Sequence, residues 1–171
     1  MYLRLALLSD LTQIKDMYRS MIARMNANHI NIWDDIYPCE FFEDDIKNKQ
    51  LYVLLDSEET LLAAFVLCPS NGGADSVRWE VQHANALYLD RLGVNAARQR
   101  EGIGQAALRE AADMARRLGA EYLRLFVVDD NEPAVRLYEK AGFQKAGGSY
   151  DEVIDDDLLL HELGFEIRTS L

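Results

Sequence analysis

RQREGIGQAALREAADMARRLG, residues 98–119, decides the fold, because it joins a glycine-containing turn to a long amphipathic helical pattern. Gly102 and Gly104 stand at the expected start of this helix, although glycine is a poor helix former. The unpaired N–H groups of a helix start attract anions, and glycine lets an anion approach the backbone closely. The stretch therefore predicts either a phosphate cradle or a tight turn that packs a helix on a sheet.

Composition restricts the class of protein. The length of 171 residues predicts a single domain over residues 1–171. A net charge of −11 disfavours a nucleic-acid surface and suits a cationic substrate such as an amine. No apolar run is long enough for a membrane span, and no cleavable signal peptide is expected. Cys39 and Cys68 make no disulfide framework, so we expect a reducing, cytoplasmic setting.

The hydrophobic pattern predicts the order β-α-α-β-β-β-α-β-α-β, with one further late strand left open. The central part, residues 86–142, predicts two parallel strands with a crossover helix, attached to an antiparallel hairpin. The fold class is therefore α/β with a mixed sheet. The expected strands cover residues 2–7, 51–56, 61–67, 86–94, 122–128 and 158–163. Of the expected helices, the first begins after Ser9, the second covers residues 40–49, the third ends before Gly119, and the fourth runs from Asn131 to Gly142.

Two motifs resemble one known family. QREGIG, residues 99–104, matches the Q/R-x-x-G-x-G/A signature of the GNAT superfamily of N-acetyltransferases. NEPAVRLYEKAGF, residues 131–143, is similar to the family's acetyl-CoA-binding helix and the strand after it. The resemblance covers residues 86–143 and implies an acyl-CoA N-acyltransferase fold, with splayed central strands flanked by helices. A different nucleotide-phosphate binder is disfavoured, because the third glycine of GxGxxG and the lysine of a P-loop are missing.

The resemblance also implies which residues bind acetyl-CoA. Leu92, Gly93 and Val94 would offer backbone groups to the pantetheine arm. Asn131 and Ala134 would lie along the cofactor. Glu101 departs from the family pattern, which often has a small or basic residue at this place. A carboxylate there weakens the positive potential beside the phosphates. The residues expected around the pyrophosphate are Gln99, Arg100, Glu101, Gly102, Ile103 and Gly104.

Tyr138 and a carboxylate are the expected catalytic residues. Tyr138 follows Asn131 by two helical turns, so both project from nearly one face of the helix. In the family, a tyrosine at this place donates its proton to the thiolate leaving group; on the helix alone, a core tyrosine is the alternative. The family often uses a glutamate on the fourth strand as the general base, and that strand has none here. Asp90 ranks first as its replacement and Glu80 second.

The acceptor remains open within the class of primary amines of small molecules, peptides or proteins. HINIWDDIYP, residues 29–38, forms either the wall of an amine pocket or an aromatic cluster that packs the loop on the core. No metal site is expected, because residues 155–157, DDD, are typical of a solvated turn. The assembly is open between a monomer and a homodimer. The alternative function is a non-catalytic acyl-CoA-binding module of the same fold.

Overall fold

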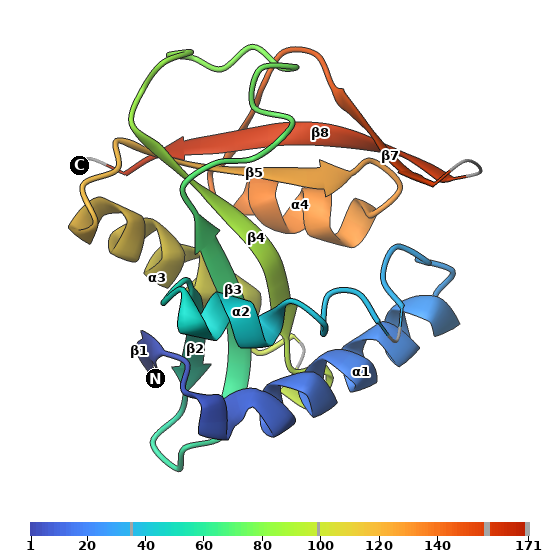
Figure 1. Cartoon of the computed structure of the whole chain (residues 1–171), viewed down its shortest axis with the longest axis vertical. Helices are drawn as coiled ribbons and strands as arrows, with labels where there is room; N and C mark the ends of the chain where they lie inside the picture. The colour runs from blue at the N-terminus through green and yellow to red at the C-terminus, as the bar shows by residue number, and fades with distance from the viewer. Residues whose placement is uncertain (35, 99, 156–157, 170–171) are drawn as a thin grey trace. The chain divides into compact units, whose positions relative to one another are not determined.

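The computed structural model describes residues 1–34, 36–98, 100–155 and 158–169 of the chain (Figure 1). Gln99, expected at the cofactor, lies outside the described residues, as do Asp35, Asp156 and Asp157. None of the described helices is long and apolar enough to cross a membrane. The single domain expected over residues 1–171 stays a prediction. The chain divides into two compact units, the first comprising Met1–Leu67 and Arg91–Glu110, the second Cys68–Asp90 and Ala111–Leu171.

The first unit is built on antiparallel strands. β1 (Tyr2–Leu5) pairs with β2 (Leu51–Leu55), and β2 pairs with β3 (Leu61–Cys68). The hairpin expected from the two apolar runs is therefore confirmed. Every residue of β2 is buried, which fits a strand that lacks charged side chains. A core cluster packs the start of the following helix on these strands: Leu54, Leu62, Ala63, Ile103, Ala106 and Ala107.

Helix α1 (Leu11–Ala27) begins later than Ser9 predicted. Leu8–Asp10 form a 3-10 turn, η1, and the N–H of Leu7 donates to Asp10 Oδ2 at 2.7 Å. The prediction of Ser9 as the N-cap was wrong, because a carboxylate is a stronger acceptor than a hydroxyl and Asp10 also pairs with Arg4. The second helix, α2 (Phe42–Lys47), is shorter than the expected range 40–49. The buried face of α1 agrees with the predicted periodicity: Ile14, Met17, Tyr18, Met21 and Ile22.

Strand β4 (Ala86–Val94) and helix α3 (Ile103–Arg117) contribute residues to both units. A 3-10 turn, η2 (Ala96–Arg98), follows β4. The predicted bounds of β4 are confirmed, and Gly119 ends α3 with a left-handed φ of +88°. Leu118, expected on the apolar face, is 56% exposed, so that face ends one turn earlier, at Ala115.

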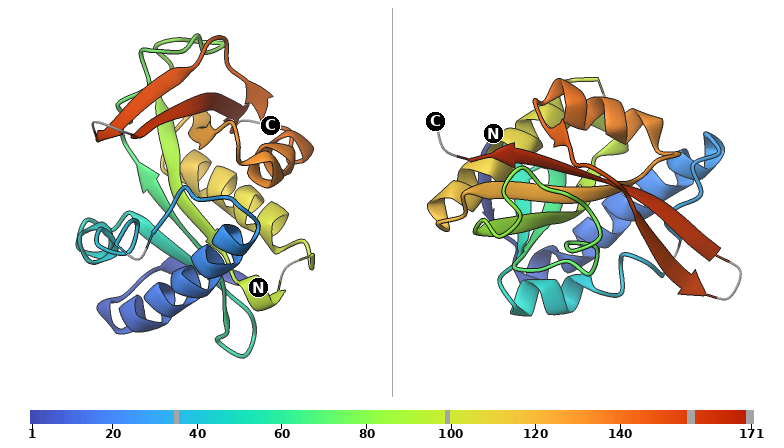
Figure 2. Two further views of the ribbon diagram at one scale, coloured as in Figure 1. Left: turned by 90° about the vertical axis from the view of Figure 1, so that its right-hand side faces the viewer. Right: turned by 90° about the horizontal axis from the view of Figure 1, so that it is seen from above.

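The second unit has β5 and β8 side by side. β5 (Tyr122–Val128) runs parallel to residues 86–89 of β4 and antiparallel to β8 (Leu158–Arg168). β6 (Gln144–Lys145) and β7 (Tyr150–Asp155) also pair with β8, which continues to Arg168 rather than ending at residue 163. Helix α4 (Glu132–Lys140) covers one face, and the loop of residues 69–85 covers the other (Figure 2).

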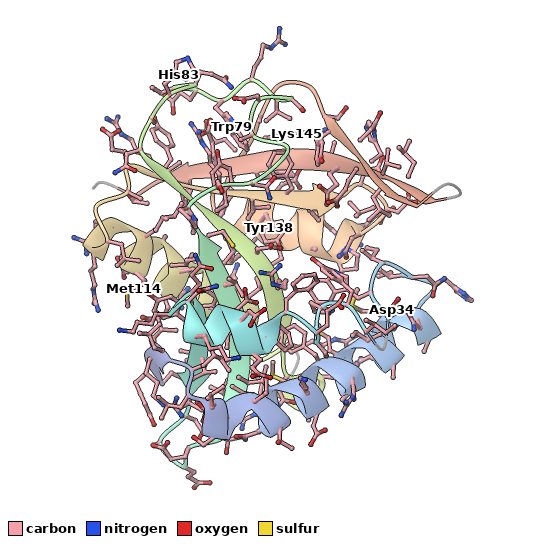
Figure 3. All side chains as sticks on the ribbon, in the orientation of Figure 1. Asp34, Trp79, His83, Met114, Tyr138 and Lys145 are labelled. Atoms are coloured by element: carbon pink, nitrogen blue, oxygen red, sulfur yellow. The ribbon has the colours of Figure 1, made fainter. Side chains whose placement is uncertain are left out.

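Side chains of β5 and β8 alternate between these two faces. On the loop face, the Trp79 ring contacts Phe126 at 5.6 Å between ring centroids, and Arg124 binds Glu166. On the helix face, Tyr138 of α4 contacts Phe165 at 6.2 Å between centroids. Figure 3 shows Trp79 and Tyr138 on opposite sides of β5 and β8. We call the face covered by residues 69–85 the loop face and the face covered by α4 the helix face.

Candidate functional site

The connection between β4 and α3 is held by neighbouring elements of the first unit. Asn95 donates its side-chain amide to the carbonyl of Leu61 in β3 at 2.8 Å, and its Oδ1 accepts the N–H of Ala97 at 3.0 Å. Arg24 of α1 donates to the carbonyl of Ala96 at 3.1 Å. These bonds hold residues 95–97, which precede the glycine turn, to β3 and α1.

The turn before α3 has left-handed backbone at two positions. Arg100 has φ +69° and Gly102 φ +77°. Left-handed residues in a turn direct neighbouring N–H groups toward one side, which makes a concave site for an anion. The N–H of Ala106 donates to the carbonyl of Gly102 at 3.0 Å. Within the part of the chain that the structure describes, the N–H groups of Gly104 and Gln105 have no backbone acceptor one turn back. A Cβ on Gly102 would meet nothing within 4 Å, so space is open beside this backbone.

The charge of Glu101 is offset by a neighbouring arginine. Arg98 Nε lies 2.9 Å from Glu101 Oε2, and Arg98 Nη1 lies 3.5 Å from Asp56 Oδ2. The unfavourable carboxylate noted in the sequence therefore has its own cation. Arg98 is in turn engaged with two carboxylates, whereas Arg100 makes no ion pair with any described residue.

Gly93 is required by a buried tyrosine. A Cβ at Gly93 would lie 2.5 Å from Cζ of Tyr18, far inside van der Waals contact. The hydroxyl of Tyr18 is 3.0 Å from the carbonyl of Ala64 and 2.5 Å from that of Arg91, so its single proton is shared between β3 and β4. Tyr18 therefore holds β4 at the segment whose backbone was expected to meet pantetheine.

Arg91 interrupts the extended conformation of β4. Its φ is +50°, and its guanidinium binds Asp45 of α2 through Nε–Oδ2 at 3.1 Å and Nη2–Oδ1 at 2.9 Å. Both side chains are about nine-tenths buried. A bidentate pair of this kind has a fixed geometry, so it holds the unusual backbone of Arg91 in place. Leu92, Gly93 and Val94 follow directly.

Asn131 begins α4 as expected. Its Oδ1 accepts the N–H of Ala134 at 3.3 Å, so the oxygen serves as the N-cap. Gly142, with φ +90°, follows the end of the helix. Asn131 thus has a structural task that accounts for its position without a ligand.

Tyr138 projects from α4 into the core of the second unit (Figure 3). It is 8% exposed and contacts Phe143 and Phe165. Burial, and then the charge of Asp90, raise the pKa of its phenol well above the usual value. Among the described residues, no buried side-chain oxygen or nitrogen lacks a hydrogen-bond partner.

Three carboxylates gather on the loop face of the second unit: Asp90 on β4, Glu152 on β7 and Glu162 on β8. Burial, then Glu152 and Asp90, raise the pKa of Glu162 to about 7. Burial and Asp90 also raise the pKa of Glu152. We call these three residues the acidic cluster. Within the described part of the chain, no group of His, Cys, Asp and Glu is arranged to hold a metal ion.

Glu80 lies at the other end of the sheet. Its Oε2 accepts the hydroxyl proton of Tyr122 at 3.0 Å, and its backbone N–H donates to Glu166. Tyr122 begins β5 and Val128 ends it opposite Glu162. Six residues of strand separate these ends by about 20 Å. The two ranked carboxylates are therefore not brought together: Asp90 joins the acidic cluster, and Glu80 joins the pair of Arg124 and Glu166.

The aromatic segment after α1 packs on itself. The ring of Trp33 stacks on Tyr18 at 5.9 Å between centroids and meets the edge of Tyr37 at 6.3 Å. Asp34 Oδ1 accepts the N–H groups of Ile36 and Tyr37, which lowers the pKa of Asp34. Of the two alternatives for this segment, the geometry favours the aromatic cluster.

The sequence reasoning missed Glu152 and Glu162. The available signal was the alternation in HELGFE, residues 161–166, which places Glu162 and Glu166 on one face of a strand. Its use required the correct end of β8 and the register with β7, neither of which was predicted.

Comparison with known proteins gives a family match. Residues 15–143 match the profile of the Acetyltransferase (GNAT) family. A Bacillus subtilis (strain 168) protein, YwnH, provisionally named a phosphinothricin acetyltransferase, is 30% identical over 148 residues, 86% of each chain.

Solved structures share the fold. A GNAT family acetyltransferase from Streptococcus agalactiae superposes with a TM-score of 0.77 at 18% identity, over 98% of this chain and 94% of that one. YncA from Salmonella typhimurium, provisionally an acetyltransferase and solved with its cofactor acetyl-CoA, gives 0.64 at 17% identity, over 99% and 94%. The expected acyl-CoA N-acyltransferase fold is thereby confirmed.

Proposed function

The chain belongs to the GNAT acetyltransferase family, and from this premise we propose that it transfers an acetyl group from acetyl-CoA directly to a primary amine. The acceptor is an amine of a small molecule, a peptide or a protein. The observation that carries the proposal is the left-handed turn at Arg100 and Gly102 before α3. The open space beside Gly102 and the N–H groups at the start of α3 suit the pyrophosphate of coenzyme A.

Backbone groups do most of the work of holding the donor in this proposal. The turn and the first residues of α3, Arg100 to Gly104, bind the pyrophosphate. Leu92, Gly93 and Val94 offer N–H and carbonyl groups to the pantetheine arm. Asn131 and Ala134 contact the cofactor from α4, with the Asn131 amide nitrogen available while its oxygen caps the helix.

Tyr138 serves as the proton donor to the thiolate. Its raised pKa keeps the phenol protonated at neutral pH, so a proton is always present. The same shift makes the phenol a weak acid toward a thiolate with a pKa of about 8.5. Tyr138 therefore acts as a relay: it passes its proton to sulfur while it regains one from the acylated nitrogen.

The acceptor must lose a proton before it reacts. A primary amine with a pKa of about 10.4 is neutral in only about one molecule in a thousand near pH 7.4, which costs about 4 kcal/mol. A carboxylate base lowers this cost if its own pKa lies near the working pH. Such a base distinguishes the enzyme from the alternative, a non-catalytic acyl-CoA-binding module.

Calorimetric titration with acetyl-CoA tests the proposal. We expect saturable one-to-one binding that is lost in Gly102→Glu, because the new side chain occupies the space beside the turn. Gly119→Glu is the matched control: Gly119 also has a left-handed φ and open space, but it lies after the other end of α3. Absence of binding to the unmodified protein at millimolar acetyl-CoA would refute the proposal. Binding without turnover of any amine would favour the non-catalytic module.

A further inference from the structure

We propose that Arg91 is a positioning residue for acetyl-CoA: its buried side chain holds the left-handed backbone that sets residues 92–94 for the pantetheine arm. The inference rests on the proposed function, and it names the side chains that control the cofactor-binding segment of β4. We call Arg91 and the three residues that hold it, Asp45, Tyr18 and Phe41, the Arg91 clamp.

The backbone of Arg91 has a conformation that arginine rarely adopts. Its φ of +50° lies in the left-handed region, where the Cβ of any L-residue comes close to the following carbonyl oxygen. Glycine adopts this conformation without that cost, but the glycine of the segment stands two residues later, at Gly93. A residue in such a conformation persists only where its surroundings determine it. The contacts of Arg91 must therefore hold this backbone in place.

The guanidinium of Arg91 is fixed by a two-bond ion pair and by an aromatic ring. Its Nε and Nη2 lie 3.1 and 2.9 Å from the two carboxylate oxygens of Asp45, and its Cζ lies 5.5 Å from the ring centroid of Phe41. A buried ion pair often contributes little more stability than apolar residues of the same volume. A planar two-bond pair does fix both the position and the orientation of the arginine, so we assign it a geometric task.

Tyr18 holds the main chain of the same residue. Its hydroxyl oxygen lies 2.5 Å from the carbonyl oxygen of Arg91, and its ring is fully buried. Residue 91 is therefore held at its side chain by α2 and at its carbonyl group by α1. Both helices and Arg91 belong to the first unit, so the clamp lies within one compact part of the chain.

The clamp lies just beyond the point where the pairing of β4 with β5 ends. The parallel register stops at Leu89 and Leu125, two residues before Arg91. β5 continues to Val128 with β8 as its partner. An irregular residue bends a strand and can terminate its pairing. In the described part of the chain the register with β5 does not extend to residues 92–94, so their backbone groups on that side can serve the pantetheine arm.

The clamp also determines which side chains of this segment face the start of α3. Leu92 and Val94 pack against the core cluster that contains Ile103, the first residue of α3. Gly93 faces Tyr18, where a Cβ would lie 2.5 Å from Cζ. A slip of one residue would exchange these two faces and drive a side chain into the tyrosine ring. The clamp therefore keeps the pantetheine segment in register with the turn assigned to the pyrophosphate.

The test compares glycine and alanine at residue 91 in an Asp45→Asn background. Both double variants lack the guanidinium, and they differ only by a Cβ on a left-handed backbone. With Arg91→Gly, we expect the Kd for acetyl-CoA to stay within about threefold of the unmodified protein, because glycine populates positive φ readily. With Arg91→Ala, the Kd should rise about 5- to 30-fold, because the binding-competent conformation becomes a minor one.

A second ligand separates positioning from a general loss of structure. 3′-Phosphoadenosine 5′-diphosphate is coenzyme A without its pantetheine arm, so it retains the pyrophosphate but has no group for residues 92–94. We expect its Kd to stay within about twofold in both double variants, because its site does not share the displaced backbone. Asp10→Asn, which breaks the ion pair with Arg4 in the same unit, should change the Kd of neither ligand.

The outcomes separate this inference from the proposed function. Equal affinity of the glycine and alanine variants for acetyl-CoA would overturn the inference, and so would equal weakening of both ligands in the alanine variant. If the alanine variant does not fold, Arg91→Asn takes its place, and its Kd should lie above that of the glycine variant, because asparagine tolerates the left-handed region only in part. Absence of acetyl-CoA binding to the unmodified protein would refute the proposed function itself.

Discussion

Replacing Gly93 by alanine tests how β4 is held. The new Cβ would lie 2.5 Å from Cζ and 2.8 Å from the hydroxyl oxygen of Tyr18, whereas carbon atoms pack at about 3.5–4.0 Å. Tyr18 is fully buried, so the ring or the strand must move by roughly 1 Å. Overpacking of this kind costs about 1–3 kcal/mol. Loss of the Tyr18 hydrogen bond to β4 adds about 1 kcal/mol.

The expected loss of unfolding free energy is therefore about 2–4 kcal/mol. Urea denaturation measures it, and calorimetry with acetyl-CoA should show weaker binding, because the displaced segment carries the groups assigned to pantetheine. The matched background is Tyr18→Ala, which removes the ring. There, Gly93→Ala should cost less than about 1 kcal/mol, since no atom of the ring remains to be displaced. An equal cost in both backgrounds would refute the reasoning.

Three further substitutions probe the other parts of the site. Asp45→Asn should lower the unfolding free energy by about 3–5 kcal/mol, because the buried guanidinium of Arg91 loses the carboxylate charge of its bidentate partner. A thermal scan should show the melting temperature falling by about 6–20 °C. Gly102→Ala should cost about 1–2 kcal/mol in urea through its left-handed φ alone, and Gly102→Asn should cost less, since asparagine tolerates that conformation. Tyr138→Phe should slow steady-state turnover at least about 10²-fold while the calorimetric affinity for acetyl-CoA stays within twofold; unchanged turnover would contradict its role as the acid.

Local signals in the sequence predicted much of the fold. Strands β4 and β5 have the expected bounds, because apolar runs between clear turn signals define them. The cap at Asn131 and the glycine ends of α3 and α4 were also predicted, since capping depends on a few adjacent residues. The start of α1 was not predicted correctly. Asp10, rather than Ser9, precedes the helix, and Asp10 forms an ion pair with Arg4.

The acidic cluster depends on contacts that the sequence does not report. β7 was not predicted, so the register that places Glu152 diagonal to Glu162 was invisible. Asp90 and Glu80 are ten residues apart in the chain, and the sequence offered no reason to separate them. The structure places Glu80 with Tyr122, at the opposite end of β5 from Glu162.

The proposed acetyl-CoA site and the acidic cluster differ in how the sequence specifies them. In the proposed function, the acetyl-CoA site depends on backbone conformation: the left-handed φ of Arg100 and Gly102 and the start of α3 would supply N–H groups, with little need for cationic side chains. This suits a chain of net charge −11, in which Arg98 is already engaged with Glu101 and Asp56. A turn of this kind requires glycines at a fixed spacing, and that spacing can be recognised in the sequence. The acidic cluster, by contrast, is formed by residues of three strands, and no local motif in the sequence marks it.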